Sequence, residues 1–189
     1  MRGLLLFIRK THDRIKEKFM EGFRMCFLET ERLRLRNVMI EDVDVIFDYR
    51  NNEICSRYQR GQTKTYDGIQ NLLEQRKDDK ITSDDACFIA VAKKDTNEMI
   101  GEIIVMPNDN TISLGYTFSY KHHRKGYAYE ALSSLIEALH DKYVDWEFIC
   151  FTDPDNQPSM ALLTKLGFRN LGYVESRDSQ MFGKWIKNV

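Results

Sequence analysis

A single passage in the middle of the chain limits the possible fold more than any other. Residues 111–119 (TISLGYTFS) have a strand pattern, residues 126–141 carry apolar side chains at helical spacing, and residues 146–152 (WEFICFT) are again strand-like. A strand, a helix and a second strand in succession form a crossover, which makes the two strands parallel and is nearly always right-handed. The fold must therefore hold at least one parallel strand pair.

The strands before this crossover follow one another through short turns. The segments KDTNE and NDN are rich in turn-forming residues, and such connections join antiparallel neighbours. Two amphipathic helices are expected before these hairpins, the first with Val43, Ile46 and Phe47 facing inward. We therefore expect a mixed α/β fold, with a mostly antiparallel sheet and helices on both faces. The expected strands are 32–38, 86–94, 99–107, 111–119, 146–152, 168–176 and 179–187, and the expected helices are 40–52, 66–79, 126–141 and 158–168.

Composition excludes several classes of function. The net charge of −1 over 189 residues argues against a nucleic-acid partner, and no segment is long enough to span a bilayer. The motifs GxxxxGK[ST] and GxGxxG are absent, which argues against common nucleotide sites. Four cysteines are scattered without a CxxC pair, so we expect reduced thiols, a cytoplasmic protein and no metal site. These cysteines are Cys26, Cys55, Cys87 and Cys150.

The loop before the central helix concentrates basic side chains. In HHRKG, His123, Arg124 and Lys125 directly precede Gly126 and the start of the helical pattern. The first turn of a helix has free backbone N–H groups and a partial positive charge, and both favour phosphate. Glycine lets the backbone come close to a ligand. The pattern favours a polyanionic diphosphate at this loop, and a solvated basic turn is the alternative.

Two motifs together resemble the GNAT superfamily of N-acetyltransferases. The family's pyrophosphate loop reads Q/R-x-x-G-x-G/A, and the stretch from His123 to Ala128 (HRKGYA) keeps the glycine and the last small residue. His123 stands where Gln or Arg is usual, and Arg124 where many members have glycine. NQPSMALLTKLGF follows about thirty residues later, where the family has its second motif. LETERLRLR, residues 28–36, resembles the opening of the branch typified by the ribosomal-protein N-acetyltransferases RimJ and RimL.

The resemblance implies how acetyl-CoA, the expected cosubstrate, would bind. In the family the strand before the loop splays from its parallel neighbour, and the pantetheine arm pairs with strand backbone. Here that strand segment is Tyr116 to Ser119, which includes Phe118. The backbone amides of Arg124 to Ala128, with Tyr127 between them, would hold the pyrophosphate. Asn156 matches an asparagine that bonds the pantetheine arm, and it is equally suited to capping the helix that follows.

The resemblance also suggests residues for the chemistry. Ser159 matches a serine near the CoA sulfur, although a first-turn serine can instead satisfy a backbone N–H. Glu102 could hold a water near the incoming amine, or it could be a paired carboxylate on the sheet. Glu130 is expected to be structural. Many members place a tyrosine general acid where this chain has Leu163, so that route is missing.

The expected activity is transfer of an acetyl group from acetyl-CoA to a primary amine by direct attack on the thioester. The acceptor is either a protein N-terminus or a small-molecule amine, and the sequence does not choose between them. A non-catalytic CoA-binding domain of the same fold is the alternative.

The first 24 residues are expected to lie outside the catalytic domain, which we place at residues 25–189. They hold seven basic and three acidic side chains, a net charge of +4, and apolar residues near helical spacing. Such a basic amphipathic segment suits docking on its own domain or on a second subunit of a homodimer, and contact with a membrane is the less favoured alternative.

Overall fold

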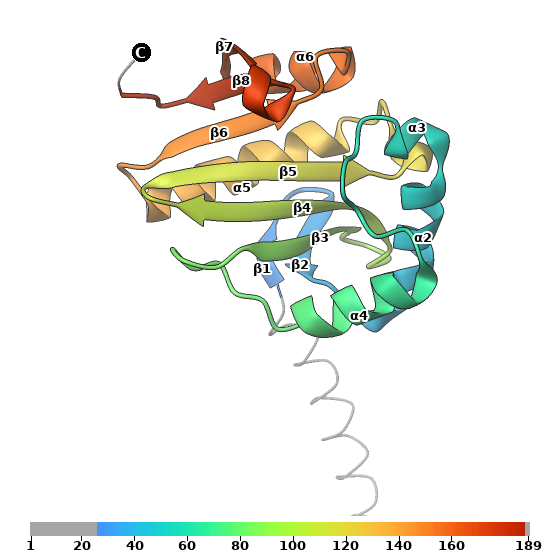
Figure 1. The fold of residues 1–189 in the computed structure, drawn as a ribbon. Coiled ribbons are helices and arrows are strands. Elements are labelled where there is room, and N and C mark those ends of the chain that lie inside the picture. The colour runs from blue at the N-terminus through green and yellow to red at the C-terminus, as the bar shows by residue number, and fades with distance from the viewer. Residues whose placement is uncertain (1–25, 188–189) are drawn as a thin grey trace, which may run out of the picture.

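The structure is a computed structural model that describes residues 26–187. These residues form one eight-stranded sheet in the order β1-β2-β3-β4-β5-β6-β8-β7 (Figure 1). The strands are β1 (Cys26–Glu29), β2 (Leu33–Asn37), β3 (Cys87–Lys93), β4 (Met99–Asn108), β5 (Thr111–Phe118), β6 (Glu147–Thr152), β7 (Arg169–Val174) and β8 (Ser179–Lys184).

Only β5 and β6 pair in parallel, as the crossover predicts, and every other neighbouring pair within the described residues is antiparallel. The crossover helix is α5 (Tyr127–Lys142). The parallel ladder runs only from the pair Thr111–Glu147 to the pair Ser113–Ile149. Beyond this point the two strands separate, although β5 continues for five more residues, Leu114 to Phe118. The splayed parallel pair is therefore confirmed.

Helices cover both faces of the sheet, as expected. One core packs the sheet against the apolar sides of α5 and of α6 (Gln157–Lys165), through residues such as Leu135 and Leu163. A second core packs the other face against α2 (Val43–Asn51) and α4 (Tyr66–Arg76), through residues such as Ile46 and Leu73. The sheet is thus held from both sides while β5 and β6 diverge.

The first expected helix, 40–52, is divided into two pieces, and a separate short helix follows them. A 3-10 turn, η1 (Ile40–Asp42), precedes α2, and a short α3 (Glu53–Ser56) follows it. Asn52 has an extended backbone, and its side chain accepts a hydrogen bond from the Ile54 N–H, so it ends one helix and caps the next. The expectation for Phe47 is wrong: it is 39% exposed and lies edge-on to Tyr66.

Two further 3-10 turns flank later elements, η2 (Tyr120–His122) after β5 and η3 (Glu175–Arg177) between β7 and β8. Among residues 26–187, no helix is long and apolar enough to cross a membrane. The predicted extension at residues 1–24 lies outside the described residues.

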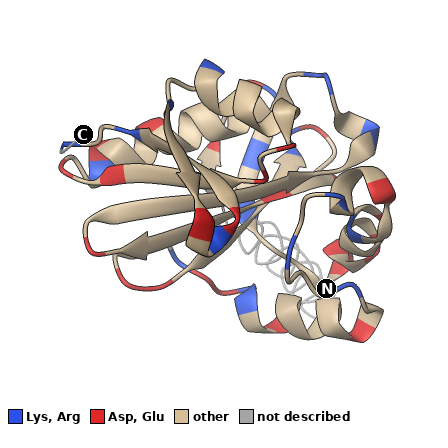
Figure 2. Ribbon diagram, turned by 45° about the horizontal axis from the view of Figure 1, so that its top comes forward, with Lys and Arg blue, Asp and Glu red and all other residues tan. Residues whose placement is uncertain are grey.

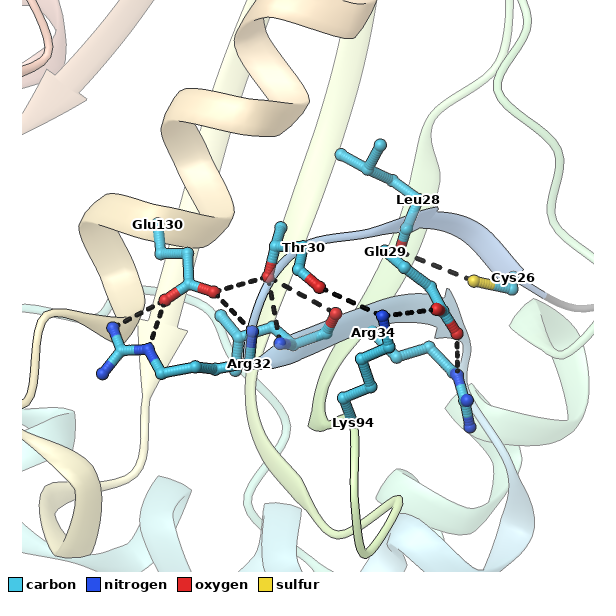
Figure 3. Close-up of polar contacts among 9 residues, drawn as sticks. Cys26, Leu28, Glu29, Thr30, Arg32, Arg34, Lys94 and Glu130 are labelled. Atoms are coloured by element: carbon cyan, nitrogen blue, oxygen red, sulfur yellow. Dashed lines mark hydrogen bonds and ion pairs between the residues drawn. The ribbon is translucent and has the colours of Figure 1, made fainter.

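Glu130, on the first turn of α5, ties that helix to the opening of β2 (Figure 3). Its carboxylate accepts hydrogen bonds from the Thr30 hydroxyl at 2.6 Å, the Arg32 backbone N–H at 2.9 Å and Arg32 Nε at 2.6 Å. Arg32 Nη1 also donates to the Lys125 carbonyl at 3.1 Å, and its guanidinium lies over the Tyr127 ring. Burial alone would raise the pKa of Glu130, but these bonds lower it below the ordinary 4.5. The structural role expected for Glu130 agrees with these contacts.

Replacing Glu130 with glutamine removes the carboxylate charge from these hydrogen bonds, and should lower the free energy of unfolding at pH 7 by about 1–2 kcal/mol. The loss is modest because Arg32 is partly exposed and water screens its ion pair. A lowered folded-state pKa contributes stability that is present above pH 4.5 and lost as pH falls through the folded value. The deficit of the variant should therefore shrink below pH 4.5 in urea unfolding. Glu31→Gln is the matched control. A deficit that stays constant with pH would contradict the assignment.

Candidate functional site

The separation of β5 from β6 leaves backbone groups of β5 without a strand partner. Ser119 donates its N–H to the Ile100 carbonyl of β4, and peptide groups on a strand point alternately to its two sides. Tyr116 and Phe118 therefore direct their N–H and C=O groups away from β4. The Tyr116 carbonyl accepts from Gln59 Nε2 at 3.3 Å, and the Phe118 carbonyl accepts from His123 Nε2 at 2.9 Å. The opening between Leu114–Phe118 and Cys150–Thr152 is called the β5–β6 gap below.

A cavity of about 210 Å³ occupies this gap. Across it, the Tyr116 hydroxyl and Ser159 Oγ are 2.9 Å apart, one from β5 and the other from the first turn of α6. Leu163, where the family often has a tyrosine, is buried in the apolar core. The gap thus brings Ser159 together with a phenol that the sequence analysis assigned only a backbone role. The cavity is lined by Tyr58, Gln59, Arg60, Leu114, Gly115, Tyr116, Cys150, Phe151, Thr152, Asp153, Asn156, Ser159, Leu163 and Ser179.

The basic loop has the backbone geometry of an anion cradle. Arg124 and Gly126 both have positive φ, 62° and 80°. Gly126 is the N-cap of α5, and no side chain caps the helix there. A Cβ atom at Gly126 would have one neighbour within 4 Å, Arg32 Nη2 at 3.5 Å. A ligand can therefore come close to the start of the helix, and the group beside it there is positively charged. The uncapped N–H groups of the first turn, including those of Tyr127 and Ala128, are suited to an anionic ligand.

The three basic side chains of this loop differ in what they contact. The His123 ring turns back to the strand and, because a carbonyl can only accept, its Nε2 carries the proton of that hydrogen bond. Lys125 Nζ donates to the Lys121 carbonyl at 3.1 Å. Arg124 has no side-chain partner within residues 26–187 and is exposed. Both charge signs are spread over the loops and helices (Figure 2), so positive charge at this loop is a local feature.

Asn156 and Glu102 are both engaged within the protein. Asn156 Oδ1 accepts from the Ser159 N–H at 3.2 Å, so the expected capping role is present, and the cap does not depend on the Ser159 hydroxyl. Glu102 is 1% exposed and accepts from Arg50 at 2.9 Å, from Gln62 Nε2 at 3.0 Å and from the Tyr49 hydroxyl. Burial raises the pKa of Glu102, against the opposing effect of Arg50. Its geometry is that of a paired carboxylate on the sheet.

A cysteine lines the gap but is not activated. Burial raises the pKa of Cys150 to about 12, so its sulfur is a thiol at neutral pH. The pKa values of Cys26, Cys55 and Cys87 are raised by burial as well. Within residues 26–187, no group of three or more His, Cys, Asp or Glu side chains could hold a metal ion.

The loop from α3 to α4 closes one side of the cavity, through Tyr58, Gln59 and Arg60. Arg60 Nη2 contacts Asp153 at 3.1 Å and Asp178 at 3.0 Å, and so joins the loop to β6 and to the last hairpin. Gln62 Nε2 also donates to Thr117 Oγ1 at 3.2 Å. The two Arg60 contacts join segments more than 90 positions apart, and no local pattern reveals them.

The model of the acetyltransferase (GNAT) domain matches residues 32–169, which is most of the chain. The chain belongs to the GNAT acetyltransferase family. It is 28% identical over 150 residues to the uncharacterized N-acetyltransferase p20 of Bacillus licheniformis, a match that covers 78% of this chain and 84% of that protein. As an N-acetyltransferase of this family, it uses acetyl-CoA as its cosubstrate.

Solved structures share this fold at lower identity. The ribosomal-protein-S5-alanine acetyltransferase of Vibrio fischeri has a TM-score of 0.64 at 17% identity, over 85% of this chain and 98% of that one. The microcin C7 self-immunity acetyltransferase MccE, solved with acetyl-CoA and AMP, has a TM-score of 0.71 at 17% identity, over 83% of this chain and 94% of that one. At these identities the likeness concerns the fold.

Gly126 provides a test of the diphosphate site. Aspartate and asparagine both tolerate positive φ and both cap helices, so Gly126→Asp and Gly126→Asn differ mainly in charge. We expect the asparagine variant to bind acetyl-CoA within about tenfold of the parent and the aspartate variant to lose a further hundredfold or so, because a carboxylate would repel the diphosphate. Calorimetry measures both affinities. Equal affinities for the two variants would place the diphosphate elsewhere.

Proposed function

We propose that this acetyltransferase moves the acetyl group of acetyl-CoA to a primary amine by direct attack on the thioester, and that it belongs to the RimJ/RimL-like branch. The observation that carries the proposal is the β5–β6 gap, which holds the Tyr116–Ser159 pair and lies on the strand that leads into the uncapped start of α5. A donor lying along β5 would have its diphosphate at Gly126 and its sulfur in the cavity.

The donor would be held mainly by backbone. The N–H groups from Arg124 to Ala128 would bind the pyrophosphate, and the exposed Arg124 guanidinium would add charge. The pantetheine arm would lie in the gap, where Tyr116 and Phe118 direct peptide groups that no strand pairs. The side-chain amide of Asn156 remains free to donate, since only its oxygen caps the helix. Ser119 would contribute by position alone, because its N–H is bonded to β4.

The reaction would need few protein groups. The amine nitrogen attacks the thioester carbonyl carbon, the C–S bond breaks with its electron pair on sulfur, and the amine loses one proton to water. The Phe118 N–H, which points into the gap, could stabilise the carbonyl oxygen as negative charge develops. Ser159 Oγ would donate a hydrogen bond to the departing sulfur. The raised pKa of Cys150 supports direct transfer over an acetyl-cysteine intermediate.

Glu102 would act on the amine only indirectly. Gln62 lies between this carboxylate and Thr117, and it is bonded to both. The Gln62 Oε1 atom is buried and has no hydrogen-bond partner within residues 26–187, so it is an acceptor suited to an amine N–H or a water. We therefore assign Glu102, with Arg50, the role of fixing Gln62 beside Thr117 of β5.

The acceptor is proposed to be a protein N-terminus or a small-molecule amine. At neutral pH roughly a tenth of an α-amine is free base, against less than about a thousandth of a lysine amine. A site without a dedicated base therefore suits α-amines better. A cytoplasmic location and a possible homodimer are further parts of the proposal. The alternative, a non-catalytic CoA-binding domain, rests on Leu163, because many members of the family have a tyrosine general acid at this position.

The proposal is tested by CoA-thiol release from acetyl-CoA over a panel of amines that includes peptides with free N-termini, polyamines and aminoglycosides. We expect turnover with at least one α-amine class, and mass spectrometry should show a gain of one acetyl group on that acceptor. Tight binding of acetyl-CoA without turnover on any amine would favour the non-catalytic alternative.

Ser159→Ala should lower kcat about tenfold while the KM for acetyl-CoA stays within about twofold, if the hydroxyl assists the departing sulfur. The melting temperature should hardly change, because Asn156 supplies the helix cap. Ser133→Ala, on the outer part of α5, is a control that removes a hydroxyl elsewhere. Unchanged turnover in Ser159→Ala would contradict the assigned role.

A further inference from the structure

The Ser159 hydroxyl has one side-chain partner among the described residues, the Tyr116 hydroxyl at 2.9 Å. Tyr116 is partly buried against the apolar core, on the strand segment that has left its parallel neighbour. Ser159 lies across the cavity on α6. The two hydroxyls therefore form the polar contact that bridges the gap at the level of the cavity.

We propose that Tyr116 is a positioning residue for acetyl transfer: its hydroxyl donates to Ser159 Oγ and so leaves the Ser159 hydrogen free to point at the donor sulfur. This inference rests on the proposed function, in which the sulfur lies beside Ser159. It assigns a role to a side chain on β5 that no family motif in the sequence marks.

The proposed direction of the hydrogen bond follows from acidity. A phenol is a much stronger hydrogen-bond donor than an aliphatic hydroxyl, since tyrosine has a pKa near 10. With the phenol donating, the serine oxygen uses one lone pair and its own hydrogen is free to rotate into the cavity. Hydrogen bonds in such a chain polarise one another, so the serine becomes a better donor to an anionic sulfur.

The pair would stabilise the leaving group without giving it a proton. Burial raises the pKa of Tyr116 further above its ordinary value, so a tyrosinate is not an accessible product. The C–S electron pair stays on sulfur as a thiolate that accepts the Ser159 hydrogen bond and later takes a proton from water.

The same contact explains how this chain works without a tyrosine on α6. At position 163 the side chain is leucine, which lines the cavity but has no acidic hydrogen to give the sulfur. The Tyr116 phenol approaches from the opposite wall of the gap and acts through Ser159. The two linked hydroxyls thus come from different elements, Tyr116 from β5 and Ser159 from α6.

A double-mutant cycle separates positioning from independent action. Tyr116→Phe should lower kcat about fivefold and leave the KM for acetyl-CoA within about twofold. Because Tyr116 acts through Ser159, the double variant should be no slower than Ser159→Ala alone. Tyr66→Phe is the matched control, since it removes an exposed phenol that bonds Asp44 away from the gap. Effects that multiply, to about fiftyfold in the double variant, would overturn the inference.

A binding measurement makes the test independent of turnover. Calorimetry near pH 8.5, where about half of a cysteine-like thiol is ionised, compares CoA with desulfo-CoA, which lacks the sulfur. The parent should prefer CoA by about fivefold, and both Tyr116→Phe and Ser159→Ala should lose that preference. If the parent binds both ligands equally well, or if only Ser159→Ala loses the preference, the inference is wrong. If neither ligand binds, the proposed donor site itself is wrong, and the inference fails with it.

Discussion

The early end of the β5–β6 ladder is the constraint on which the rest of the structure depends. After three paired positions, the peptide groups on one side of β5 have no strand to bond. Buried peptide groups need partners, and the protein supplies some of them from outside the sheet. Gln59 and His123 each bond one of these carbonyls, and Tyr116 lines the cavity. A ligand with amide groups would bond the peptide groups that β5 leaves unpaired beyond Ser113.

The two cores explain how the sheet tolerates this opening. On one face α5 and α6 pack against the same apolar surface, so helices and the pairing with β8 hold β6 in place where it no longer pairs with β5. On the other face α2 and α4 pack over β3 and β4. The buried Arg36–Asp42 and Arg50–Glu102 pairs, with nitrogen–oxygen distances of 2.8 and 2.9 Å, hold α2 and its preceding turn to the sheet. Packing, buried ion pairs and the intact β4–β5 and β6–β8 ladders thus support the sheet where β5 and β6 diverge.

The sequence predicted what depends on local pattern. The crossover, the hairpin turns and the position of Gly126 follow from periodicity and from residue type, and the structure confirms each of them. Phe47 was predicted wrongly because a helix at the rim of a domain has a narrower buried stripe than its apolar residues suggest. Strand β1 and the restart of the helix at Asn52 were not predicted either, since both are short. The Tyr116–Ser159 contact depends on how far two strands diverge, which no single segment encodes.

The Glu130 contacts with the opening of β2 also bear on how the donor site comes into being during folding. Arg32 lies 98 positions from Glu130 and 93 positions from Lys125, and it touches both. Closing a loop of that length costs chain entropy, which the contacts made by Arg32 alone do not offset. Such contacts therefore form only as the whole domain condenses. The basic loop gains its contact with Arg32 only when the first strands and the crossover helix pack together. If the loop holds the donor diphosphate as proposed, affinity for the acetyl donor is a property of the completed domain, because a partly folded chain has the same loop sequence without the Arg32 contacts.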